Sequence, residues 1–188
     1  FWVDSAEVER RLEDKEWSRG WLMLRGGLCL STDVRTLIAN VIPTAAVGDK
    51  FLLMMPEAEP SLIAALLGCL NCLVCDFVTR QKVGGTALKY FTMKQVAVLS
   101  PQQYSGLDLA FIVPRVLELS YTAHDLAPWA RDLGYEGPPF PFDPERRARL
   151  RAELDAYYAR LYGLTRDELR YILDPADVMG DDYPSETF

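Results

Sequence analysis

The longest apolar stretch of this chain, residues 62–78, limits the folds it can adopt more than any other feature. Ser61 can cap a helix that starts there, and Asn71 and Asp76 are the polar interruptions. Because nearly every face of a helix over residues 61–79 would be apolar, we predict that it is buried inside the protein. The interruptions leave no uninterrupted run of the roughly 18 apolar residues that a membrane span needs, so we expect no membrane partner.

Strands and further helices are expected around this buried helix. Apolar segments bounded by turn residues predict strands over residues 21–30, 36–42, 51–55 and 90–99. Capping residues, helical periodicity and terminal glycines predict helices over residues 5–16, 107–122, 125–133, 143–162 and 165–173. The sequence therefore predicts an α+β fold. A small mixed β platform with one buried helix occupies residues 1–104, and a helical C-terminal part occupies residues 105–188.

The charge is distributed unevenly along the 188 residues, whose net charge is −7. Basic and acidic side chains balance over residues 1–100, and all of the excess acidity lies in residues 101–188. Between Phe77 and Leu107 the chain has basic residues and no acidic one. This local field can attract an anionic partner although the total charge is unfavourable. Because the chain starts at Phe1 rather than at Met, we interpret it as part of a longer protein.

Three cysteines, Cys69, Cys72 and Cys75, are spaced as in some metal sites. They lie within the predicted buried helix, where a free cysteine packs as a small hydrophobic side chain. A fourth ligand would have to be the distant Cys29. We therefore predict reduced, metal-free thiols in the core, and expect a reducing, cytoplasmic location because the chain has so few cysteines.

No arrangement of residues predicts catalysis by this chain alone. His124 is the single histidine, and no nucleophile elbow accompanies it. Gly137-Pro138-Pro139-Phe140 has glycine where a methyltransferase motif needs an amide or a carboxylate, and no Gly-rich cofactor loop is present. We predict no catalytic residue, no metal ligand and no cofactor site in this chain.

The segment from Arg80 to Thr86, Arg-Gln-Lys-Val-Gly-Gly-Thr, permits two interpretations. Its cations, amide and hydroxyl suit phosphates and base edges, and its two glycines permit close approach of the backbone. Alternatively, the basic residues complement the dipole of the preceding helix, and the glycines form an ordinary turn. Composition alone favours the second interpretation.

At this segment the sequence resembles a known family. Leu70-Asn71, the run from Asp76 to Thr86, Tyr90-Phe91 and Lys94-Gln95 are similar to the target-recognition region of large adenine-specific DNA methyltransferases, the type IIG restriction–modification enzymes and their phage-defence relatives. Upstream, Ser31-Thr32-Asp33-x-Arg35-Thr36 resembles the "S-T-x-x-R-T" strand of that family. Residues 108–121, 162–174 and 183–188 resemble its C-terminal helical segment, so the resemblance covers nearly the whole chain.

The resemblance implies that this chain is the DNA target-recognition part of an N6-adenine methyltransferase that uses S-adenosylmethionine. The partners would be double-stranded DNA and the catalytic domain of the parent enzyme, which would hold the cofactor. The residues expected at DNA are Arg35, Thr36, Arg80, Gln81, Lys82, Gly84, Gly85, Thr86 and Lys89. The alternative is a protein-interaction module that docks a partner through its helical half, and an independent enzyme is a third possibility. The recognised sequence and any cleavage of DNA by the parent enzyme are not determined by these residues.

Overall fold

The structure, a computed structural model, describes residues 3–29, 33–85 and 87–174. Its sheet consists of the antiparallel strands β1 (Trp21–Gly26), β2 (Ala39–Pro43) and β3 (Phe51–Met54), in the order β2-β1-β3. Trp21 pairs with Pro43 at one end of β1, and Gly26 pairs with Phe51 at the other. The central strand β1 is buried along most of its length, as expected for an apolar segment with a neighbour on each side.

The predicted buried helix is two helices, α2 (Pro60–Asn71) and α3 (Leu73–Arg80), which meet at an angle of 57°. Cys72 between them has an extended backbone, with φ −77° and ψ 152°. The break leaves the first amides of α3 without intrahelical acceptors. The Asp155 carboxylate accepts a hydrogen bond from Leu73 N at 2.7 Å, and the Cys72 sulfur accepts one from Cys75 N. These bonds stabilise the break between the two helices, although residue 72 is neither of the usual helix-breaking residues, proline and glycine.

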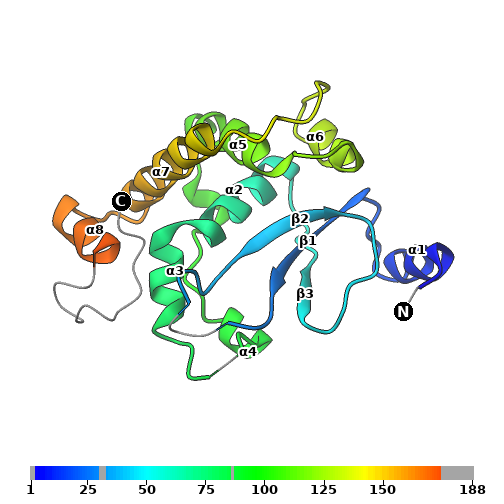
Figure 1. Ribbon diagram of the computed structural model, residues 1–188, viewed down its shortest axis with the longest axis horizontal. Helices are drawn as coiled ribbons and strands as arrows, with labels where there is room; N and C mark the ends of the chain where they lie inside the picture. Colours follow the sequence, from blue (N-terminus) through cyan, green and yellow to red (C-terminus); the bar gives the residue numbers. More distant parts are fainter. Residues whose placement is uncertain (1–2, 30–32, 86, 175–188) are drawn as a thin grey trace.

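Helices of the C-terminal half pack on α2 and α3 (Figure 1). Helix α5 (Gly106–Ser120) packs along α2, and α7 (Pro144–Leu161) packs on α5. Helix α8 (Arg166–Leu173) contacts α3, and α6 (Ala127–Asp132) lies at the opposite end. Helix α1 (Ser5–Glu13) lies beside the sheet near the N-terminus.

One hydrophobic core joins the two parts of the chain. Ile63 of α2, Ile112 of α5 and Tyr158 of α7 are all fully buried in it. At the end of the sheet near α6, the rings of Trp17, Trp21 and Trp129 pack edge to face. The platform and the helical part therefore bury their apolar surfaces against each other.

The predicted α+β class is confirmed, with two differences in detail. The sheet, which we expected to be mixed, is wholly antiparallel. The strand predicted over residues 90–99 is wrong, because α4 (Tyr90–Met93) occupies its start and irregular backbone the rest. Here the amides of Met93 and Lys94 bond to carbonyls four residues earlier, those of Lys89 and Tyr90, at 3.0 Å each. These local bonds replace a sheet ladder.

Candidate nucleic-acid interface

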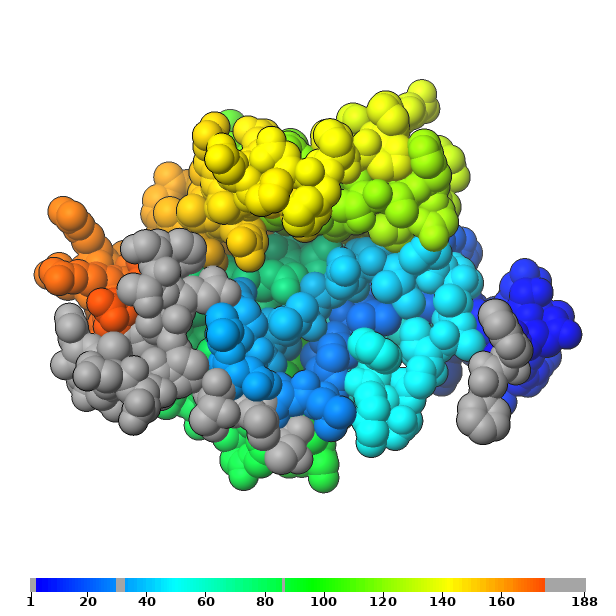
Figure 2. Space-filling view, viewed as in Figure 1, coloured from blue at the N-terminus to red at the C-terminus, as the bar shows by residue number. Residues whose placement is uncertain are grey.

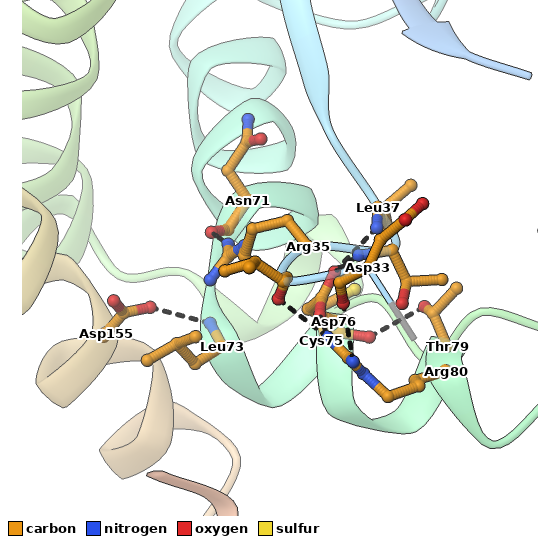
Figure 3. Close-up of polar contacts among 12 residues, drawn as sticks. Asp33, Arg35, Leu37, Asn71, Leu73, Cys75, Asp76, Thr79, Arg80 and Asp155 are labelled. Carbon is orange, nitrogen blue, oxygen red and sulfur yellow. Dashed lines mark hydrogen bonds and ion pairs between the residues drawn. The ribbon is translucent and has the colours of Figure 1, made fainter. Parts of the chain in front are cut away.

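A buried ion pair on α3 fixes the loop that leads into β2 (Figure 3). Asp76 and Arg80 lie one helical turn apart, with side chains 3 % and 6 % exposed and a distance of 3.1 Å between Oδ2 and Nη2. The other carboxylate oxygen accepts hydrogen bonds from the backbone amides of Thr36 and Leu37 at 2.8 and 2.6 Å. The guanidinium of Arg80 donates to the carbonyls of Asp33 and Val34 at 2.7 and 2.8 Å. Further residues extend this hydrogen-bond network.

Asn71, the last residue of α2, fixes the start of β2 in the same way. Its side-chain amide donates to the Ala39 carbonyl at 2.9 Å and accepts from the Ala39 amide at 3.1 Å, as a neighbouring strand would. The guanidinium of Arg35 donates to the Asn71 backbone carbonyl. Arg35, Asn71, Asp76 and Arg80 are motif residues of the resemblance, and together they hold the residue 33–39 segment against α2 and α3 (Figure 3).

Three residues that we expected at DNA therefore have structural roles in this arrangement. Arg80 is buried, and its guanidinium points into the protein rather than outward. Thr36 is 3 % exposed, and its hydroxyl has no hydrogen-bond partner among the described residues. Arg35 is half-buried beside Asn71. The guanidinium groups of Arg35 and Arg80 and the backbone amide of Thr36 hold the platform together.

The other expected residues lie on the surface, except Thr86, which is outside the described residues. Gln81, Lys82, Gly84 and Gly85 are exposed in the turn that follows α3. Neither glycine has a positive φ, and a Cβ atom added at either position would meet nothing within 4 Å. Side chains would therefore fit here in the free protein, so the turn does not require glycine.

The end of β1 fixes the chain as it returns from this turn. Ala87 forms an antiparallel bridge with Leu28, and Leu88 N donates to the Gly27 carbonyl at 2.9 Å. The buried Arg25 of β1 donates to the Leu88 carbonyl, and burial lowers the pKa of its guanidinium. These contacts hold the backbone immediately before Lys89, whose side chain is exposed. Lys89 therefore projects from a fixed backbone.

Helix α4 adds exposed residues that our sequence reasoning did not include in the site. Tyr90 and Phe91 are 55 % and 65 % exposed, and Lys94 follows the helix on the surface. Figure 1 places α4 on the same side of the molecule as the turn after α3. The sequence itself indicated these residues, because lysines and aromatic residues lie close together there in a segment without carboxylates. The mistaken strand assignment concealed it.

The cysteines and the histidine lie away from this exposed segment. Cys69 in α2, Cys72 at the break and Cys75 in α3 are buried, and burial raises the pKa of the Cys72 thiol. Among the described residues, no group of three or more His, Cys, Asp or Glu side chains is placed to hold a metal ion. His124 is exposed at the start of a short 3-10 turn, His124–Leu126.

A scan against models of protein families found no match, and neither did searches of curated proteins and of solved structures. In the described parts of the chain, no single helix is long and apolar enough to cross a membrane. Within the same described residues, the bent pair of α2 and α3 is the one pair of helices that reaches that length and composition together.

Proposed function

We propose that this protein binds double-stranded DNA through exposed side chains that lie between Gln81 and Gln95 along the chain. One observation carries the proposal: Lys82, Lys89 and Lys94 are exposed, and so are the aromatic residues Tyr90 and Phe91 of the same segment. The whole stretch between Phe77 and Leu107 contains no carboxylate. None of the three lysines has an ion-pair partner among the described residues. Unpaired ammonium groups on a fixed backbone are suited to phosphate contacts.

Each kind of exposed side chain has a distinct role in this proposal. The lysines contact phosphates and supply affinity that does not depend on sequence. The amide of Gln81 can bond to an adenine base edge, and so contributes to sequence choice. The open space around Gly84 and Gly85 lets the backbone of the turn approach a duplex closely. Arg35 and Arg80 act indirectly, because they hold the platform from which this segment projects.

The parent enzyme is proposed to be an S-adenosylmethionine-dependent N6-adenine DNA methyltransferase whose catalytic domain lies elsewhere. This part rests on the resemblance. It is supported by the positions of Arg35, Asn71, Asp76 and Arg80, which come from separate motifs and whose hydrogen bonds all join residues 33–39 to α2 and α3. Such a network is expected when motif residues determine a common local structure.

A second function, docking of a protein partner on the helical half, is favoured by two apolar side chains. Leu107 at the start of α5 is 83 % exposed, and Phe142 before α7 is 73 % exposed. Salt dependence separates the two functions, because binding through several phosphates weakens steeply with salt and apolar docking does not.

The proposal is tested by fluorescence anisotropy with a labelled duplex at several salt concentrations. We expect Lys82→Ala and Lys89→Ala each to weaken binding to every duplex and to lower the salt slope by about one unit. Lys15→Ala is the matched control, since Lys15 is equally exposed but follows α1, far from α4 (Figure 1). Gly84→Val should reduce affinity without affecting folding, because its Cβ meets nothing in the free protein.

The DNA proposal is wrong if the folded Lys82 and Lys89 variants keep the affinity and salt slope of the unmodified protein. It is also wrong if Lys15→Ala weakens binding as much as they do, since the attraction would then come from overall charge.

A further inference from the structure

A cavity of about 300 Å³ lies between the helical layer and the edge of the sheet. Figure 2 shows this hollow between α7, drawn in yellow, and the blue segment that leads into β2, with the blue-green α2 region at its base. Its volume is at the lower end of the range of about 300–1,000 Å³ found for small-molecule sites. No described residue between Gln81 and Gln95 is in the cavity's lining, so the cavity does not belong to the proposed DNA interface.

Three arginines line this cavity, and they come from two separate parts of the chain. Arg35 reaches it from the loop before β2, and Arg147 and Arg151 reach it from α7. Hydrogen bonds to the carbonyls of Asn71 and Leu119 orient the guanidinium groups of Arg35 and Arg147 at the wall. Arg151 is exposed and has no hydrogen-bond or ion-pair partner among the described residues.

Charge and shape define the ligand that this cavity suits. Among the described residues that line the cavity, Asp155 is the one carboxylate, so three guanidinium groups and one negative charge give a net of +2. A phosphate monoester carries close to two negative charges at neutral pH, and planar guanidinium groups bond to two of its oxygens at once. The inner wall is apolar, with buried side chains of Leu67, Val116 and Leu154.

We propose that this cavity binds a small organic phosphate monoester. The phosphate group lies among Arg35, Arg147 and Arg151, and a compact apolar body lies against Leu67, Val116 and Leu154. Neither feature would suffice alone: an inorganic anion leaves the apolar wall uncovered, and an apolar molecule brings no anion to the guanidinium groups. The site therefore distinguishes its ligand by the combination of the two groups.

The test is calorimetric titration of the whole chain with phenyl phosphate, which combines a dianion with a compact apolar body. Saturable binding is expected, with inorganic phosphate and phenol each binding at least about tenfold more weakly, a difference of about 1.4 kcal/mol. Absence of phenyl phosphate binding would overturn the proposal. Equal binding of phenol, or of inorganic phosphate, would also overturn it, because one half of the site would then contribute nothing.

Two variants that should fold normally identify the site. Arg151→Gln removes an exposed guanidinium, and Asn40→Asp places a carboxylate at the cavity without a change of shape. Each is expected to weaken phenyl phosphate binding about tenfold. Arg149→Gln is the matched control, because Arg149 is exposed on the same helix but does not line the cavity. Equal weakening by Arg149→Gln, or unchanged binding in both other variants, would refute the assignment.

Discussion

Replacing Arg80 by alanine is expected to lower the free energy of unfolding by about 3 kcal/mol, because it leaves the charge of Asp76 buried without its cation. Loss of one partner of a buried ion pair costs about 3–5 kcal/mol. Asp76 would keep the amides of Thr36 and Leu37, at 2.8 and 2.6 Å, and these retained bonds place the cost at the lower end. Truncation also removes the donors to the carbonyls of Asp33 and Val34. Because Val34 is 59 % exposed, water can replace the lost donor there at little cost.

Urea denaturation followed by tryptophan fluorescence measures this loss. Lys82→Ala is the control, because the exposed Lys82 follows Arg80 by two positions and its truncation should change stability by less than about 0.5 kcal/mol. Arg80→Lys should recover only part of the loss, because an ammonium group cannot reach all the acceptors that the planar guanidinium contacts. A loss below about 1 kcal/mol for Arg80→Ala would refute the reasoning, since a buried charge would then have lost its partner almost without cost.

Two further predictions concern the packing of α2 against α7 and an ion pair between α5 and α7. Gly68→Ala should destabilise the protein by about 1–3 kcal/mol in denaturant titration, because its Cβ would lie 2.7 Å from the hydroxyl of the buried Tyr158. Gly106→Ala should leave stability unchanged or slightly raised, since nothing lies within 4 Å of the added carbon, and equal losses at both glycines would refute the packing argument. The guanidinium of Arg146 lowers the pKa of the Glu118 carboxyl, so this pair stabilises the folded state above the ordinary carboxyl pKa and loses its effect as pH falls through the lowered value. Glu118→Gln should therefore reduce the fall in the urea midpoint below about pH 4.5; identical pH profiles would contradict this.

Local signals determined much of the fold. The predicted helix over residues 143–162 matches α7 because Asp143 caps it, accepting from Arg146 N at 3.0 Å, and Gly163 follows its end with φ +75°. Likewise, Thr165 and Glu168 form the predicted capping box of α8. The strand predicted over residues 90–99 was wrong because the pattern of apolar residues there is compatible with more than one structure. A strand needs a neighbouring strand edge, and the segment forms the local bonds of α4 instead.

The sequence by itself determined the composition of the candidate interface: a basic segment free of carboxylates after an apolar helix. Only the tertiary structure decided which cations face outward. Arg80 lies one turn from Asp76, on the face of α3 that packs against residues 33–37, so its guanidinium is buried, whereas Lys82 lies beyond the helix end and is exposed. The break at Cys72 also depends on the tertiary structure. The Asp155 carboxylate that accepts from the amide of Leu73, the first residue of α3, lies 82 residues further along the chain than Leu73. Contacts between residues so distant in sequence depend on how the helices pack, which no local pattern specifies.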